Sequence, residues 1–333
     1  MKLKFSTWIV LLGMVMVVTG CSKTGDGDWG DGGGNGNGNG DGNYPIGAIN
    51  GIFSVSDTEK VYFSQGNLQY KASTNTWRFA EHQWDYVGSQ NPYQVNPHGD
   101  IYLVEPCGTV TGSDNCLISP TYSGWIDLFC WGTSGFNHGA NCYQPWSTST
   151  EDGDYCAYGV STCNLYDHTG KADWGYNAIS NGGNSLGQWH TPTIDEWTYV
   201  FDLRSTVSGI RYALARVNEV NGVILLPDDW NTDIYALNNT NQNDASFASN
   251  TISVSQWAIL QRNGAVFLPA AGARGIRYGI TISFYWSSTC ENRSDGASFM
   301  AYHIGLYFDG LETGNGCGAF SNGEAVRLVC PAN

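Results

Sequence analysis

Residues 187–197 read GQWHTPTIDEW, and this stretch decides much of the fold. Thr193 and Glu196 have the spacing of a capping box, in which two side chains satisfy free backbone N–H groups at the start of a helix. The apolar residues that follow recur at helical spacing: Ile194, Trp197, Val200 and Phe201. The sequence therefore predicts a short helix that begins near residue 194.

A second capping box, formed by Ser253 and Gln256, predicts another short helix, which Asn263-Gly264 would end. Short strand-like runs lie around both helices, at residues 51–56, 61–70, 223–226, 265–268, 285–287, 303–308 and 325–329. Long loops occupy much of residues 88–185. Two short helices among many short strands and long loops indicate an α+β domain.

Four segments form an ordered series along the chain: GQWHTPTIDEW at 187–197, FLPAAGAR at 267–274, YWSST at 285–289 and GEAVRLV at 323–329. Their order and spacing resemble the C-type lectin-like fold in its formylglycine-generating-enzyme branch, and within it surface lipoproteins of the Bacteroidales type. Some of those proteins are variable proteins of diversity-generating retroelements. The resemblance implies small antiparallel sheets with long loop insertions. It also implies one C-type lectin-like domain over residues 44–333, with its signatures at about 185–330.

The first twenty residues have the pattern of a lipoprotein signal peptide. Lys2 and Lys4 precede an apolar run, Trp8 to Val18, that is too short to span a bilayer comfortably. The sequence VTGC at 18–21 resembles the lipobox of bacterial lipoproteins, which implies that Cys21 carries the lipid. An ordinary signal peptide with an incidental cysteine is the alternative. We expect an outer membrane lipoprotein, exposed at the cell surface and held to the membrane only through its N-terminal lipid.

Residues 21–43 form a segment rich in Gly, Asn and Asp, and ten of the nineteen residues at 25–43 are glycine. This composition cannot form a core, so we expect a flexible tether. The whole chain has 15 Lys and Arg against 30 Asp and Glu, a net charge of −15. That balance argues against nucleic acid and anionic lipid surfaces as partners, because both attract basic side chains.

The sequence lacks the common catalytic and metal-binding motifs. The enzymes of the resembled branch use two cysteines close together near the C-terminal end, whereas Cys317 and Cys330 are thirteen residues apart. The six histidines lack a metal-binding spacing such as H-E-x-x-H, and no C-x-x-C pair occurs. Asp228 and Asp229 could supply oxygen ligands to calcium, but we favour a polar loop after the strand at 223–226. We expect a protein that binds without a chemical step, with no cofactor and no metal.

Nine cysteines remain if Cys21 carries the lipid. Export permits disulfides, and the pairs nearest in sequence are 107–116, 130–142, 156–163 and 317–330. That pairing leaves Cys290 free. Sequence alone does not give the connectivity, and burial of several cysteines as small hydrophobic residues is the alternative.

Two arginines, Arg274 and Arg327, lie in otherwise apolar segments. A buried charge requires partners, so we expect carboxylates or backbone carbonyl groups beside them, with Glu196 as one candidate. Trp189 and Trp197 are large enough to anchor a small sheet against the first helix. We interpret all of these residues as structural and assign them no chemistry.

The segment from Cys290 to Asn322 is the candidate recognition surface. Residues 303–308 alternate between two sets, which predicts a strand whose aliphatic face packs on the core and whose other face exposes His303 and Tyr307. Tyr and His offer stiff contact area, and Ser and Asn offer adaptable hydrogen bonds. The candidate ligand-binding residues are Asn292, Arg293, Ser294, Asp295, Ser298, His303, Tyr307, Asp309, Asn315, Phe320 and Asn322. An ordinary solvated hairpin is the alternative.

The resemblance to retroelement variable proteins sorts this segment further. In those proteins, substitution at adenines changes Asn-type codons, which can yield the residue types of the eleven candidates. Such codons cannot yield Glu or Met while the third base stays a pyrimidine. Four residues are therefore expected to belong to the framework: Glu291, Met300, Glu312 and Glu324.

These observations predict a surface lipoprotein whose C-type lectin-like domain binds a protein or glycan ligand. A retroelement-diversified receptor or adhesin is the form of this function that the resemblance implies. Two alternatives stay open. One is a structural or tip subunit of a surface fibre, with partner contacts from residues 44–180. The other is an oxidase like the formylglycine-generating enzyme, which would need a close reactive cysteine pair or bound copper.

Overall fold

The computed structural model describes residues 44–88, 93–95, 101–103, 108–136, 143–155, 163–275, 281–291, 299–307 and 310–332. The chain divides into two units, Met1–Gly40 and Asp41–Asn333, and every described residue belongs to the second. The predicted signal peptide, Cys21 and the tether lie outside the described residues. Over the ranges given above, no helix is long and apolar enough to cross a membrane.

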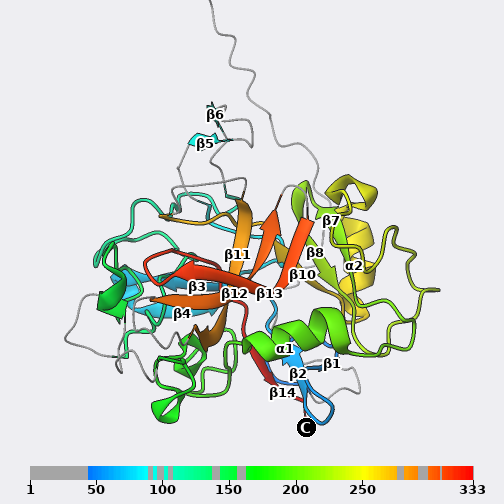
Figure 1. The fold of residues 1–333 in the computed structure, drawn as a ribbon, viewed down its shortest axis with the longest axis horizontal. Coiled ribbons are helices and arrows are strands. Elements are labelled where there is room, and N and C mark those ends of the chain that lie inside the picture. The colour runs from blue at the N-terminus through cyan, green and yellow to red at the C-terminus, as the bar shows by residue number, and fades with distance from the viewer. Residues whose placement is uncertain are drawn as a thin grey trace, which may run out of the picture. The chain divides into compact units, whose positions relative to one another are not determined.

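One small antiparallel sheet joins the two ends of the described chain (Figure 1). Its strands, in the order β1-β2-β14, are β1 (Phe53–Ser54), β2 (Lys60–Phe63) and β14 (Val329–Pro331). The register places Val329 opposite Phe63. The last strand, β14, therefore pairs with β2 near the start of the described chain.

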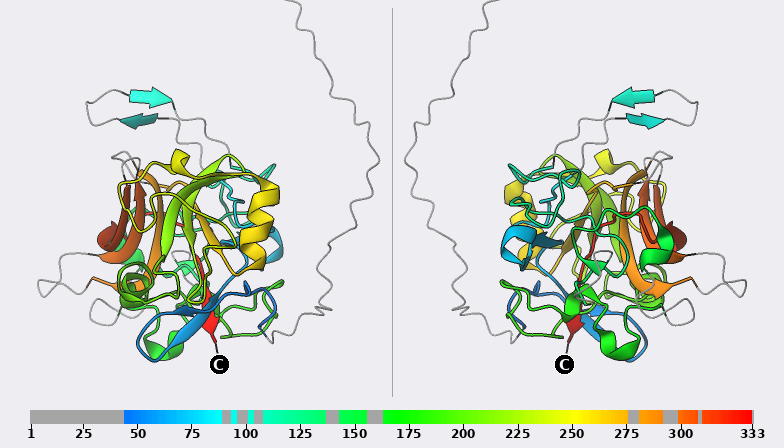
Figure 2. Two further views of the ribbon diagram at one scale, coloured as in Figure 1. Left: turned by 90° about the vertical axis from the view of Figure 1, so that its right-hand side faces the viewer. Right: turned by 90° about the vertical axis from the view of Figure 1, so that its left-hand side faces the viewer.

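A four-stranded sheet has the order β10-β8-β7-β9. Its strands are β7 (Tyr212–Val217), β8 (Val220–Leu225), β9 (Thr251–Ile252) and β10 (Val266–Pro269). Asn218 and Glu219 connect β7 and β8, and both have positive φ, as a two-residue hairpin turn of this kind requires. Helix α2 (Val254–Arg262) packs Trp257 and Leu260 against this sheet (Figure 2).

The third sheet contains most of the candidate recognition segment. Its strands are β11 (Thr281–Cys290), β12 (Met300–Tyr307) and β13 (Gly310–Ala319), and they pair in that order. Tyr285 and Ile304 belong to one hydrophobic cluster, whereas Trp286 and Ala301 belong to another. The middle of this sheet is therefore covered on both faces.

Short elements fill the connections. Strand β3 pairs with β4, and β5 pairs with β6. Their bounds are β3 (Leu68–Lys71), β4 (Thr76–Phe79), β5 (Tyr93–Val95) and β6 (Ile101–Leu103). The 3-10 turns are η1 (Ala72–Thr74), η3 (Asp152–Tyr155), η4 (His168–Gly170), η5 (Trp174–Tyr176) and η7 (Phe247–Ser249). The described part of the chain is thus α+β, with small, mostly antiparallel sheets and two short α-helices, as predicted.

Both predicted capping boxes are confirmed. Helix α1 (Ile194–Thr198) begins after Thr193, whose Oγ1 accepts from the Glu196 N–H at 3.1 Å. Glu196 Oε2 in turn accepts from the Thr193 N–H at 2.7 Å, and the chain continues as a π-helix, η6 (Tyr199–Leu203). Ser253 and Gln256 form the same pair of bonds ahead of α2.

Glu196 also lies 3.7 Å from His190, so its partner is a histidine and not one of the two arginines. Arg327 is wholly buried, and its guanidinium donates to Gln83 Oε1 at 2.8 Å and to the Phe267 carbonyl at 3.3 Å. Burial lowers the pKa of Arg327 to about 9. Arg274 donates to the Ser147 carbonyl at 3.3 Å. The expected carbonyl partners are confirmed for both arginines.

The cysteine pairing predicted from sequence proximity is wrong at three of its four pairs. A disulfide joins Cys163 to Cys290, so Cys290 is not free and Cys163 does not pair with Cys156. Cys130 and Cys330 are free, buried thiols, which excludes the 130–142 and 317–330 pairs. Burial raises the pKa of the Cys330 thiol to about 12. Cys107, Cys142 and Cys156 lie outside the described residues.

The physical reason for the Cys163–Cys290 disulfide is a contact between a loop and the end of β11. Leu165 N–H donates to the Ser288 carbonyl at 2.9 Å, and Cys290 N–H donates to Asn164 Oδ1 at 3.0 Å. These bonds bring together segments 127 residues apart, which spacing in the sequence does not reveal.

Candidate functional site

A shallow, open groove of about 470 Å³ lies where β12 ends and β13 begins. The residues that line it are Asn243, Asp244, Tyr307, Gly310, Leu311, Glu312, Thr313 and Gly314. Six of them belong to the candidate recognition segment, and the other two belong to the loop before η7. This groove is the candidate ligand site.

An irregularity in the β12–β13 pairing shapes the groove. Between the pairs His303–Gly316 and Gly305–Glu312, three residues of β13 face a single residue of β12. Extra residues of this kind leave the regular ladder and bend the strand, and such bulges are common beside functional sites. The bulged residues 313–315 include two that line the groove.

Tyr307 and Glu312 form one wall of the groove. Tyr307 Oη donates to Glu312 Oε2 at 2.9 Å, and both side chains are half-buried. The tyrosine ring lies over Gly305, where an added Cβ would come within 2.6 Å of it, and it meets the Phe284 ring edge-on at 5.7 Å. The ring is therefore held in place before a ligand arrives, which lowers the ordering cost of binding.

The loop at 243–244 forms the other wall. Leu311 N–H donates to the Asn243 carbonyl at 2.8 Å, and Tyr212 Oη donates to the Asn243 side chain. Asn243 and Asp244 are both exposed. These bonds fix a loop from the middle of the chain against the C-terminal hairpin.

The groove has an acidic character. Asp244 and Glu312 are the charged residues among those that line it, and Thr313 Oγ1 donates to a third carboxylate, Asp202 Oδ2, at 2.6 Å. Burial raises the pKa of Tyr212 to about 12, and the charges of Asp202 and Asp244 contribute to that rise, whereas Arg211 opposes it. Burial is thus the main cause of the raised pKa of Tyr212, and the two carboxylates add to it.

His303 is buried, with 3% of its surface exposed, so its predicted exposure is wrong. The predicted alternation is right, because Ile304 and Leu306 belong to one hydrophobic cluster while His303 points to the other face. That face is also covered. Glu324 Oε2 lies 2.9 Å from His303 Nδ1, and the Phe284 ring stacks on the imidazole at 4.1 Å.

The sequence contains one sign of this buried pair, namely the alternating glycines of β13. A Cβ on Gly316 would lie 2.5 Å from His303 Cδ2, and one on Gly318 would lie 2.4 Å from Glu324 Oε1. Burial raises the pKa of Glu324, and the neighbouring His303 offsets part of that rise. These glycines make room for two polar side chains beneath the strand.

The other candidate residues divide into three groups. Phe320, which is 1% exposed, stacks on Trp131 at 5.5 Å and is core, contrary to the expectation. Asn322 is half-buried, and Asn315 lies in the bulge of β13. The remaining candidates lie outside the described residues: Asn292, Arg293, Ser294, Asp295, Ser298 and Asp309.

Seven of the eight groove residues were not among the sequence candidates, and four of these seven have polar side chains. Glu312 was assigned to the framework, and no sequence pattern indicated Thr313 as a binding residue. Asn243 and Asp244 lie about sixty residues earlier in the chain, in a polar loop whose composition resembles that of its neighbours. Only the fold brings that loop to the hairpin.

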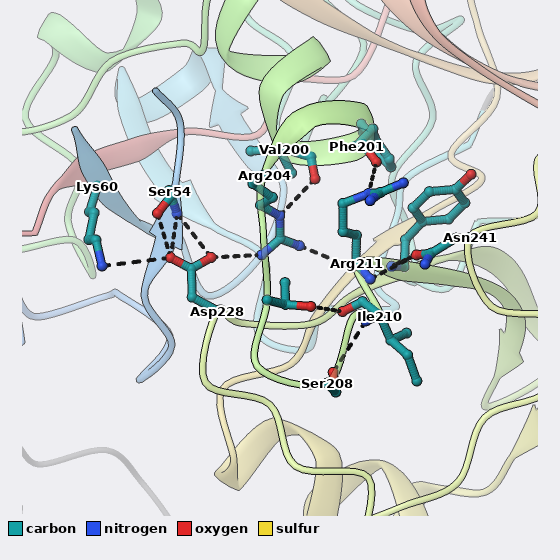
Figure 3. Close-up of polar contacts among 12 residues, drawn as sticks. Ser54, Lys60, Val200, Phe201, Arg204, Ser208, Ile210, Arg211, Asp228 and Asn241 are labelled. Atoms are coloured by element: carbon teal, nitrogen blue, oxygen red, sulfur yellow. Dashed lines mark hydrogen bonds and ion pairs between the residues drawn. The ribbon is translucent and has the colours of Figure 1, made fainter. Parts of the chain in front are cut away.

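Asp228, the candidate calcium ligand, is occupied by protein donors (Figure 3). Its carboxylate accepts from Ser54 Oγ at 2.6 Å and from Arg204 Nη1 at 3.1 Å, and it lies 3.9 Å from Lys60 Nζ. Burial lowers the pKa of Arg204 to about 10, although Asp228 opposes that change. Asp228 thus holds the end of β1 to the end of η6. In the described ranges, no group of three His, Cys, Asp or Glu residues could hold a metal ion.

Comparison of the chain with protein-family models, with curated proteins and with solved structures gives no match. A function must therefore be argued from the residues and the groove.

Proposed function

We propose that the protein is a surface-anchored lipoprotein whose C-type lectin-like domain binds a protein or glycan ligand in the groove at the adjoining ends of β12 and β13. The observation that carries this proposal is the groove itself, which lies on the hairpin that the sequence marks for recognition. Its lining offers an aromatic ring, carboxylates, an amide and a hydroxyl group. A hollow with an aromatic ring and a few fixed polar groups is a plausible place for ligand recognition on physical grounds, because these groups orient a ligand.

The C-type lectin-like assignment is part of this proposal, and contacts among the four signature segments support it. The last segment forms a backbone bridge to each of the other three. These bridges are His190–Val329, Arg274–Gly323 and Tyr285–Ala325. Segments that are recognisable as a set in the sequence therefore meet around residues 323–329.

Ligand screening on protein and glycan arrays with the purified protein tests the binding site. Once a ligand is found, Tyr307→Ala should weaken its binding at least tenfold, because truncation of a held aromatic residue at an interface often has a large cost. Tyr166→Ala is the matched control, because Tyr166 is exposed but does not line the groove. A ligand that binds equally well to Tyr307→Ala would overturn the site assignment.

Two further measurements test the rest of the proposal. Incorporation of labelled fatty acid that is lost in Cys21→Ala would support the lipid anchor. A reverse transcriptase gene beside the coding sequence, with a near-copy of its 3′ segment that differs at adenines, would support diversification. Neither result depends on the groove.

A further inference from the structure

We infer that the groove selects ligands that carry a positive group, an ammonium or a guanidinium. This inference rests on the proposed function, namely that the groove binds a ligand. It adds the chemical class of the group that the groove recognises.

The charges around the groove are the first observation. None of the described residues that line it is basic, and its two charged residues, Asp244 and Glu312, are both acidic. Asp202 lies behind Thr313 as a third carboxylate. Arg211, whose charge acts on Tyr212 in the opposite direction, donates its Nε–H to the Phe201 carbonyl, as Figure 3 shows.

Both carboxylates of the groove have oxygen atoms that form no hydrogen bond with another described residue. Glu312 accepts from Tyr307 Oη through Oε2, and its Oε1 has no hydrogen bond with another described residue. The exposed Asp244 carboxylate likewise forms no hydrogen bond or ion pair among the described residues. A ligand with several N–H donors would satisfy these oxygens, and the face of the Tyr307 ring would add a cation–π attraction.

His303 supplies an independent observation. It is almost fully buried, and its Nδ1 is engaged by Glu324, which favours a proton at that nitrogen and leaves Nε2 as an acceptor. Nε2 has no hydrogen bond with another described residue. A Cβ on Gly316 would lie 2.7 Å from His303 Nε2 and 2.9 Å from Glu312 Oε2, so both acceptors flank the same point. A ring nitrogen of the nearly buried His303 thus lies beside the Glu312 carboxylate of the groove.

Two sources could supply the positive group: a Lys or Arg side chain of a protein, or an amino sugar of a glycan. Titration of the purified protein with small probes, followed by NMR chemical shifts, separates them. The cationic probes are Nα-acetyl-arginine amide, Nα-acetyl-lysine amide and glucosamine, and the neutral counterparts are Nα-acetyl-norleucine amide and glucose. We expect a cationic probe to bind at least fivefold more tightly than its neutral counterpart. We also expect its affinity to fall when NaCl is raised from about 50 mM to about 500 mM.

Isosteric variants link that preference to the groove. Glu312→Gln and Asp244→Asn should each weaken binding of the cationic probe several-fold. Asp233→Asn should leave it unchanged, because it removes the same charge from an exposed residue outside the groove. Equal binding of neutral and cationic probes, or cation binding that survives both groove substitutions, would overturn the inference. An array ligand that depends on Tyr307 but not on charge would remove this inference and leave the proposed function intact.

Discussion

At the scale of single residues, Asp127 is a wholly buried carboxylate that faces neutral donors. Asn115 Nδ2 donates to it at 2.7 Å and the Val87 N–H donates at 2.8 Å. Burial raises the pKa of Asp127 to about 6, and these hydrogen bonds offset only part of the rise. Through these two hydrogen bonds, Asp127 connects the loop at residues 87–88 to the loop at 113–115.

This environment predicts an effect of pH on stability. A carboxyl whose pKa is raised in the folded state binds its proton more tightly there than in the unfolded chain. The contribution of Asp127 to stability should therefore fall as the pH rises from about 4 to about 6, by up to about 3 kcal/mol at about 1.4 kcal/mol per pKa unit. Urea unfolding at several pH values measures it.

Asp127→Asn removes the titrating group, so its free energy of unfolding should lose that part of the pH dependence relative to the wild type. Asp229→Asn is the control, because Asp229 is exposed and should give the wild-type slope. Parallel pH profiles for wild type and Asp127→Asn would contradict the assignment.

At the scale of elements, the β13 glycines and the buried His303–Glu324 pair depend on one another. Gly316→Ala would place a Cβ 2.5 Å from His303 Cδ2, closer than side-chain packing permits. We expect it to destabilise the protein by about 1–3 kcal/mol, as overpacking of a filled core does. Chemical denaturation measures this change.

Two comparisons separate overpacking from other effects. Gly153→Ala should cost little, because a Cβ there would lie 3.7 Å from the nearest atom, on the Phe299 ring. The substitution Gly316→Ala should be less costly in a His303→Ala background than in the wild type, since the clashing ring is absent. Equal costs in the two backgrounds would show that the histidine is not the obstacle.

The predictability of each element follows from the range of the interactions that form it. Both capping boxes are local, because each joins residues three apart, and both are confirmed. The strand at 303–308 was predicted with the right alternation, since that pattern is also local. Exposure is set by whatever covers the strand. Glu324 comes from a segment about twenty residues later, so the burial of His303 could not be read from the alternation.

The groove could likewise be predicted only in the part that local sequence patterns determine. Tyr307 was predicted as a binding residue and lines it, whereas the wall at 243–244 comes from another part of the chain. Glu312 was set aside because of its codon class, although its carboxylate is the partner of Tyr307. Composition indicated the hairpin but not the loop that completes the site.

At the scale of the whole described unit, residues 325–330 connect its packing. Ala325 and Val329 belong to one hydrophobic cluster, whereas Val326, Leu328 and Cys330 belong to a second. The same segment bridges to the three other signature segments. Packing around the C-terminal segment therefore links parts of the chain that lie far apart in sequence.

The Cys163–Cys290 disulfide adds a covalent link of the same long range, between a loop and the last residue of β11. A cross-link between segments 127 residues apart restricts the unfolded chain strongly. We therefore expect the double variant Cys163→Ser, Cys290→Ser to lose about 2–5 kcal/mol of unfolding free energy. Thermal unfolding with and without dithiothreitol provides the check: the reductant should lower the melting temperature of the wild type by more than it lowers that of the double variant. A wild-type melting temperature that does not respond to complete reduction, confirmed by thiol titration, would show that packing alone holds the loop to β11.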